Sequence, residues 1–223
     1  MKPAYVVGAG VLLTAIMPQA SPQGGADAVE VLRGVQTHYN AVRSLVADFT
    51  EESRSSAIGR STTAHGVMRI KKLGKMRWDY AGRDEHSLYV NNSGIYLYVR
   101  SEGTVYQSNL PNGSCASVGL EFLAGTVNLA KDYIPTLGAG GRSGEERIVL
   151  APKKRGTPLR SFALDVFGPQ HVLRGFRATN DAGDTWNFRF SNLRENVAFQ
   201  DSIFVFRRPV GTEVLSFRSE CGG

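Results

Sequence analysis

The sequence predicts one mainly β domain with a few helices, an α+β fold in which antiparallel strands supply most of the structure. Three observations support this: an amphipathic helical pattern near the start, a long succession of segments that alternate apolar and polar residues, and a break in that alternation near the middle. The 223 residues are 42% hydrophobic and 21% charged, an ordinary globular composition. No internal repeat or low-complexity linker divides the body, so we expect residues 24–223 to form a single domain.

The N-terminal stretch, residues 1–23, has the pattern of a secretory signal peptide. A charged start at Lys2 precedes an apolar run over residues 4–17 and then a small-residue stretch, with cleavage expected between about residues 20 and 26. The apolar run is shorter than the ~20 residues that a membrane span needs. No cysteine follows it at the place where bacterial lipoproteins carry their lipid. We therefore expect an exported, soluble mature chain.

The first predicted element of the body is a helix over residues 27–43. Asp27 followed by Glu30 forms a capping-box pattern, and apolar residues then recur at steps of four and three. Alternation and turn residues predict strands after it. The expected strands are 45–55, 62–72, 75–81, 86–90, 95–101, 104–110, 146–154, 161–167, 172–180, 185–193 and 203–209.

The alternation breaks over residues 115–134, where the apolar residues have no period of two. This stretch predicts one or two short helices that end or bend at Gly125. On either side of it, aromatic residues concentrate in the predicted strands. Met76, Trp78 and Tyr80, for example, share one face of a strand. Two interpretations are open at this point: a sandwich core, or a sheet curled around an apolar cavity.

Catalytic patterns are absent from the sequence. It has no GxSxG, P-loop, HExxH or dinucleotide fingerprint. His86 beside Asp84 and Glu85 is explained by a solvated charged loop. Neither a metal nor a cofactor is expected, and we expect no enzyme. The formal charge of +6 comes from basic residues spread along the chain without a nucleic-acid-binding motif, so nucleic acid is not an expected partner.

The two cysteines, Cys115 and Cys221, lie far apart in the sequence. Export permits a disulfide between them, which would tie the C-terminal tail to the middle of the chain. Two unpaired thiols are the alternative, and the sequence does not decide between them.

Five segments together resemble a known family. They are "VLRGVQTHYNAVRSLVADFTEE", "GVMRIKKLGKMRWDY", "LYVNNSGIYLYV", "LEFLAGTVNLAKDY" and "FVFRRPVGTEV". In this order, and over almost all of the mature chain, they are similar to the LolA family, the periplasmic carriers of outer-membrane lipoproteins.

The resemblance implies an incomplete antiparallel β-barrel with short helices as a lid over an apolar cavity. It implies a periplasmic carrier that takes acylated lipoproteins from an inner-membrane lipoprotein-releasing ABC transporter and passes them to an outer-membrane lipoprotein receptor. That receptor is itself a lipoprotein, so the missing lipid-attachment cysteine favours the soluble carrier. A monomer is expected.

The resemblance also assigns expected site residues. It places Met76, Trp78 and Leu97 on the acyl-chain-binding side of the sheet, and Leu120, Phe122 and Leu123 in the lid. Lys72 stands where the family has a basic residue, usually Arg, that is linked to hand-over to the receptor. Lysine lacks the planar fork of arginine.

The neighbouring positions leave alternatives open. Leu73 stands where the family commonly has proline, and the lysines around it also fit a simple solvated turn. For the whole chain, the alternatives are a lipid- or glycolipid-binding relative with the same half-barrel, an envelope-sensing domain of this fold, and an exported hydrolase. The missing catalytic residues argue against the hydrolase.

Overall fold

The computed structural model describes residues 27–108, 122–123, 125, 127–139, 141–154 and 159–216. Within these residues the fold is a 12-stranded sheet in the order β12-β6-β5-β4-β3-β2-β1-β11-β10-β9-β8-β7. All neighbouring pairs are antiparallel except β12 and β6, which are parallel. The two outermost strands, β12 and β7, do not pair with each other, so the sheet stays open. The fold is therefore mainly β, as the sequence predicts.

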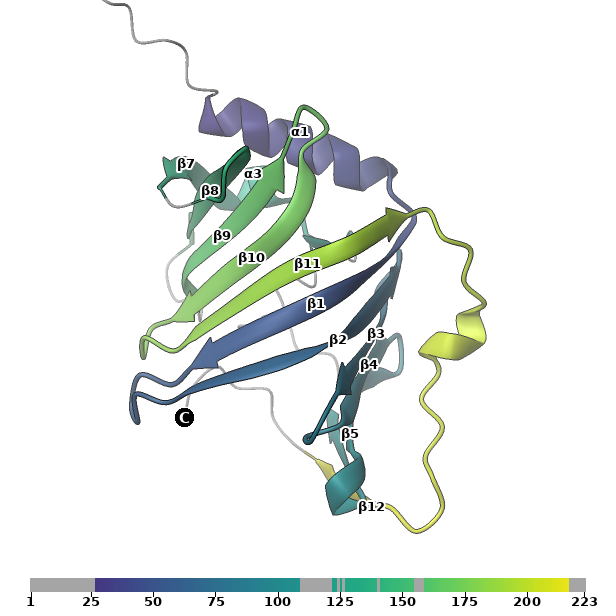
Figure 1. Ribbon diagram of the computed structural model, residues 1–223. Helices are drawn as coiled ribbons and strands as arrows, with labels where there is room; N and C mark the ends of the chain where they lie inside the picture. The colour runs from purple at the N-terminus through teal and green to yellow at the C-terminus, as the bar shows by residue number, and fades with distance from the viewer. Residues whose placement is uncertain are drawn as a thin grey trace, which may run out of the picture.

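The strands follow the predicted alternation closely in most of the chain. They are β1 (Ser44–Arg54), β2 (Ser61–Lys71), β3 (Lys75–Ala81), β4 (His86–Asn91), β5 (Gly94–Val99), β6 (Thr104–Ser108), β7 (Tyr133–Gly138), β8 (Glu145–Pro152), β9 (Leu159–Phe167), β10 (Val172–Asn180), β11 (Thr185–Glu195) and β12 (Glu213–Ser216). Short hairpin connections join most consecutive strands, so sequence neighbours are also sheet neighbours (Figure 1).

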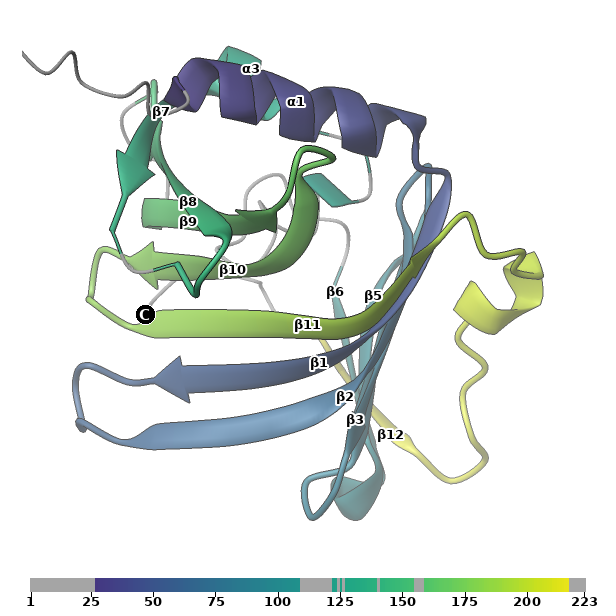
Figure 2. The same cartoon turned by 45° about the horizontal axis from the view of Figure 1, so that its top comes forward.

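The predicted N-terminal helix is present as α1 (Ala28–Ala41). Asp27 caps it, because its side chain accepts a hydrogen bond from the backbone N–H of Val29. The apolar stripe of α1, which includes Leu32 and Val35, is buried. The sheet curls, and α1 lies across one side of the curl (Figure 2). A second short helix, α3 (Leu129–Asp132), packs against α1 and β7.

Two strands were not predicted, and one predicted strand is wrong. β7 and β12 have no clear alternation, and they are the two edge strands, each paired with one neighbour of the sheet. Residues 203–209, predicted as a strand, contain the end of the 3-10 helix η2 (Asp201–Phe204) followed by irregular chain. Their alternation has another cause: Phe204 is buried, and Phe206 stacks on Tyr96 with ring centroids 5.3 Å apart.

The segment from 197 to 206 therefore packs on the outer face of the sheet instead of joining it. Asp201 accepts hydrogen bonds from Lys71 and Lys75, each with an oxygen–nitrogen distance of 2.6 Å. The carbonyl of Phe204 accepts another from Asn91, at 3.0 Å. Figure 1 shows this segment in yellow, running along the side of the sheet before β12.

Candidate functional site

The concave face of the sheet is an apolar surface built by the inward residues of successive strands. The register places Ala47, Met68, Trp78, Leu88 and Leu97 opposite one another across β1 to β5, so that their side chains share one face. The first three are buried in the main core, and Leu88 packs against that core. Trp78 therefore lies on the inward face of its strand, together with Met76.

Around Trp78 the concave face is lined by aromatic rings from neighbouring strands. Phe49 on β1 meets the indole edge to face at 4.8 Å, and Phe188 on β11 does so at 5.5 Å. Phe176 on β10 stacks on Phe188 at 4.5 Å. The strands fix these contacts because all four side chains occupy inward positions of adjacent or nearly adjacent strands.

Helix α1 and the short segment at Phe122 cover the same interior. Phe122 and Leu123 are helical and buried, and the ring of Phe122 lies 5.5 Å from that of Tyr39 on α1. Tyr39 in turn accepts a hydrogen bond from the backbone N–H of Leu173 at 2.9 Å, and burial raises the pKa of its phenol. These residues join one core cluster with Met76 and Trp78.

Apart from Lys72, the remaining predicted site residues fall in two groups: Leu97 is described, and three others are not. Leu97 is half-buried and shares the face of Trp78 at the far side of the row. Leu120, Cys115 and Cys221 lie outside the described residues, so their predicted roles in the lid and in a disulfide stay predictions.

Lys72 makes contacts with helix α1 that the sequence did not predict. Its ammonium donates hydrogen bonds to the backbone carbonyls of Tyr39 (2.5 Å) and Asn40 (2.6 Å), in the last turn of α1. A cation here complements the partial negative charge of the helix C-terminus. The aliphatic part of Lys72 lies beside Gly125, where an added Cβ would come within 3.1 Å of it. Lys72 thus links the β2–β3 turn to α1 and to the turn after Phe122.

The other lysines near this turn also have partners. Lys71 and Lys75 both form ion pairs with the exposed carboxylate of Asp201 on the outer face. Leu73 has φ +71°, in the left-handed region. Proline, whose ring fixes φ near −65°, could not adopt this conformation. The turn therefore differs from one built on the proline that the family commonly has.

A polar group lies at the end of the concave face away from α1. Tyr80 donates a hydrogen bond to Glu51 at 2.7 Å, and the ring of His86 stacks on Tyr80 at 4.0 Å. Burial raises the pKa of Glu51 above its ordinary value, although the bond from Tyr80 opposes the rise. The concave face is therefore polarised: it is apolar from Trp78 towards α1 and polar at Tyr80 and Glu51.

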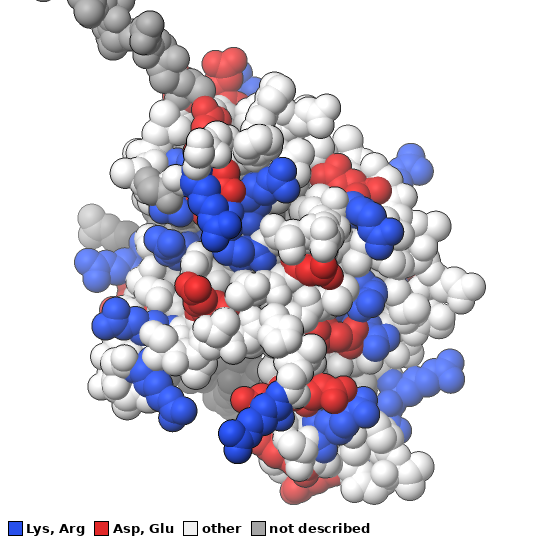
Figure 3. Space-filling model, viewed as in Figure 1, with Lys and Arg blue, Asp and Glu red and all other residues white. Residues whose placement is uncertain are grey.

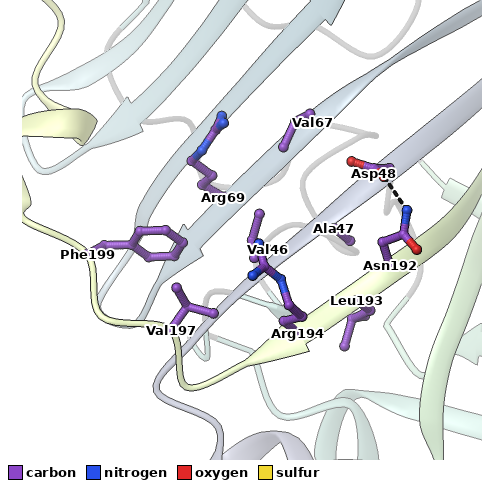
Figure 4. Close-up of a pocket in the computed structure, with 10 residues that line it drawn as sticks. All are labelled: Val46, Ala47, Asp48, Val67, Arg69, Asn192, Leu193, Arg194, Val197 and Phe199. Carbon is purple, nitrogen blue, oxygen red and sulfur yellow. Dashed lines mark hydrogen bonds between the residues drawn. The ribbon is translucent and has the colours of Figure 1, made fainter.

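A groove lies on the opposite, outer face of the sheet. It has a volume of about 570 Å³ and runs between strands β1, β2 and β11 and the chain that follows β11 (Figure 4). Valines and Phe199 line part of it, with Arg69 and Arg194 beside them. Asn192 donates a hydrogen bond to Asp48 across two of its strands. The groove is open and shares no lining residue with the aromatic layer around Trp78.

Elsewhere on the outer face, four charged side chains form one cluster of ion pairs. Arg147 and Arg189 share the nearly buried carboxylate of Asp165, at 2.7 and 3.0 Å, and Arg189 also binds Glu145. Figure 3 shows basic and acidic side chains interspersed over the face seen in Figure 1. In the described part of the chain, no helix is long and apolar enough to cross a bilayer.

The sequence did not single out several residues that shape this site. Tyr39 belongs to the predicted apolar stripe of the helix, but its bond to the start of β10 depends on tertiary contacts. Glu51 looked like an ordinary charged strand residue. Its inward parity with Phe49, two residues earlier, is the signal that could have identified it.

Comparisons with known proteins agree on one relationship. A family model described as "Outer membrane lipoprotein carrier protein LolA" matches residues 40–207. An outer-membrane lipoprotein carrier protein of Chromobacterium violaceum is 24% identical over 218 residues, which cover 97% of this chain and 99% of that relative. One of Nitrosospira multiformis is 25% identical over 174 residues, covering 78% and 83%. An uncharacterized conserved protein from Thermus thermophilus has a similar fold, with a TM-score of 0.51 at 9% identity, covering 84% of this chain and 98% of that one.

Proposed function

This chain belongs to the LolA family of outer membrane lipoprotein carrier proteins, and we propose that it is a periplasmic carrier that holds lipoprotein acyl chains against its concave face. In this proposal it receives lipoproteins from an inner-membrane lipoprotein-releasing ABC transporter and delivers them to an outer-membrane receptor. Met76, Trp78 and Leu97 contact the acyl chains, and Phe122 and Leu123, with Leu120, form the lid.

The proposal rests on one observation: small elements outside the sheet cover its apolar concave face. Apolar and aromatic residues of β1 to β3 and β8 to β11 form one buried cluster, and Leu88 and Val90 of β4 pack against it. The same cluster includes most of the apolar stripe of α1, Phe122 and Leu123, and α1 lies across the curled sheet (Figure 2). Helix α1 and the segment at Phe122 are small elements that pack on the sheet through side chains and a few polar contacts. Displacing them exposes the surface without breaking the strand pairing of the sheet, which is what a reversible lipid carrier requires.

The energies involved are of similar size. The buried apolar stripe of α1 has five members, Ala28, Val31, Leu32, Val35 and Tyr39. Each of the larger ones contributes about 1.5–3 kcal/mol through burial, so that the stripe as a whole contributes on the order of 10 kcal/mol. An acyl chain of about 15 methylenes gains about 12 kcal/mol when it leaves water. Because the two terms are of similar size, one bound acyl chain can replace the packing of α1 with a small net change in free energy.

Hand-over is proposed to involve Lys72. Its ammonium holds two carbonyls at the end of α1, and its stem touches the turn at Gly125. A carboxylate of the receptor that attracts this ammonium would compete with the two carbonyls and thereby loosen α1. Charge complementarity with an acidic partner acts mainly on the rate of association, so hand-over should slow as salt rises.

Direct identification of cargo tests the proposal. Native mass spectrometry of the protein purified from the periplasm should show bound acylated lipoproteins. In addition, the purified protein should bind a fluorescent fatty acid saturably. Co-purified phospholipid or glycolipid without lipoprotein would favour the lipid-binding alternative. A folded protein that binds no acyl ligand at all would refute the carrier proposal.

Two substitutions locate the binding surface. Trp78→Glu and Phe122→Glu place a carboxylate in the apolar interior, at a cost of several kcal/mol unless it is neutralised. We expect both to weaken fatty-acid binding at least tenfold. Ile58→Glu makes the same chemical change at a side chain that is 73% exposed, and it should leave binding unchanged. If Trp78→Glu and Phe122→Glu stay folded and bind as the parent does, the acyl chains lie elsewhere.

A further inference from the structure

Trp78 carries an unsatisfied donor in the middle of the concave face. Among the described residues, its indole Nε1 is the one buried side-chain polar atom without a hydrogen-bond partner. The side chain is only 1% exposed. A buried donor without a partner loses its hydration and gains no hydrogen bond in return, so it lowers stability. Such a group calls for an explanation other than core packing.

Among the described residues, none accepts a hydrogen bond from this donor. Phe49, Phe188 and Phe190 lie around the indole, with ring centroids 4.8 to 6.4 Å away. Met68 and Leu88 are its neighbours across the adjacent strands. A phenylalanine could fill much of this space without a buried N–H. The position therefore combines an apolar wall with one donor that no described residue of the protein accepts.

From this we propose that the Trp78 Nε1–H donates a hydrogen bond to a carbonyl oxygen of the bound acyl group, an ester or an amide. The inference rests on the proposed function, and it deepens it by naming the part of the cargo that is recognised. An indole N–H is a donor only, and an acyl carbonyl is an acceptor only. Both are neutral, so their bond forms in an apolar interior without burying a charge.

The polarity of the concave face agrees with this contact and gives the bound chain a direction. On one side of Trp78, towards α1, the face continues with Met76, Ile70 and Leu45, all buried and apolar. On the other side lie Tyr80 and Glu51. With its carbonyl at Trp78, a chain would extend its methylenes towards α1 and its polar head towards Glu51. Trp78 would thus set how deep the chain enters.

The test compares two ligands that differ in the carbonyl. A monoacylglycerol and the alkyl glycerol ether of equal chain length are competed against a fluorescent fatty acid, on the parent protein and on Trp78→Phe. We expect Trp78→Phe to weaken the ester about 3- to 10-fold, the range of one neutral hydrogen bond. The ether should change less than twofold. Trp186→Phe makes the same change on the partly buried Trp186 of β11 and should not discriminate between the two ligands.

A second measurement needs no variant of Trp78. The chain has two tryptophans, so the Trp186→Phe spectrum assigns the indole N–H resonance of Trp78. This resonance should move downfield when the ester binds and not when the ether binds. Equal losses for both ligands in Trp78→Phe, or a resonance that the ester does not move, would overturn the inference and leave the indole as packing or as a donor to a ring face. If neither ligand binds the parent protein, the proposed function fails instead.

Discussion

Removing the Lys72 ammonium should loosen the end of helix α1. Lys72→Met keeps most of the aliphatic stem beside Gly125 and deletes the group that donates to the carbonyls of Tyr39 and Asn40. Hydrogen bonds from a charged donor contribute about 1.5–3 kcal/mol each at most. Because this group is partly exposed and solvent replaces some of the loss, we expect about 1–3 kcal/mol for the pair together.

That free energy converts into a measurable change in the opening equilibrium of the helix end. With 1.4 kcal/mol for each factor of ten, the protection of amides in the last turn of α1 should fall about 5- to 100-fold in native-state hydrogen exchange. Uptake of a fluorescent fatty acid, followed by stopped-flow mixing, should accelerate if displacement of α1 limits it. The thermal midpoint should fall by about 2–10 °C.

The neighbouring lysine supplies the control. Lys71→Met removes an ammonium of the same kind, but that ammonium binds Asp201 and the carbonyl of Phe199 on the outer face. It should leave exchange in α1 unchanged. The reasoning is refuted if Lys72→Met exchanges like the parent in α1, or if Lys71→Met speeds the same amides equally.

Three further predictions concern single groups. Burial raises the pKa of Glu51 above its ordinary value of 4.5. Between the two pKa values the folded state therefore binds more protons than the unfolded state, and the free energy of unfolding falls as pH rises. Glu51→Gln should remove this dependence on pH in urea unfolding between about pH 4 and pH 8, and an unchanged dependence would contradict the prediction. Two hydrogen bonds from lysines lower the pKa of Asp201 to about 2. Asp201→Asn should therefore speed hydrogen exchange in residues 197–206, while the amides of α1 keep their protection. Unchanged exchange in residues 197–206 would show that other contacts hold this segment. Leu73 has φ +71°, so Leu73→Asn should raise stability by about 1 kcal/mol in the same urea assay, whereas a loss would mean that the leucine side chain packs.

The helix and most strands followed from the sequence because their patterns are local. The cap at Asp27, the steps of four and three after it, and the alternation through residues 75–81 each depend on residues close together in the chain. Hairpin connections then make neighbours in sequence neighbours in the sheet. The resemblance to a known family added the curl of the sheet, which alternation by itself could not distinguish from a sandwich.

The errors arose where contacts are long-range. Residues 203–209 alternate like a strand, yet Phe204 and Phe206 pack on the outer face of the sheet and the segment does not pair with any strand. Strands β7 and β12 have weak patterns of their own and exist because each finds a free edge. An edge strand takes its hydrogen bonds from its neighbour, so its own sequence carries little information about it.

For the candidate site, the sequence by itself determined which residues share a face: the parity of strand β3 puts Met76 and Trp78 on the same side whatever the fold around them. Only the tertiary structure decided what meets them there. In the folded chain, Phe49 and Phe188 pack around the indole, and no described residue accepts a hydrogen bond from its N–H. Lys72 donates hydrogen bonds to carbonyls at the end of α1. Parity is a property of one strand and its backbone. The contacts around Trp78 instead join segments of which some lie more than a hundred residues apart, and only the pairing and curling of the whole sheet bring these together.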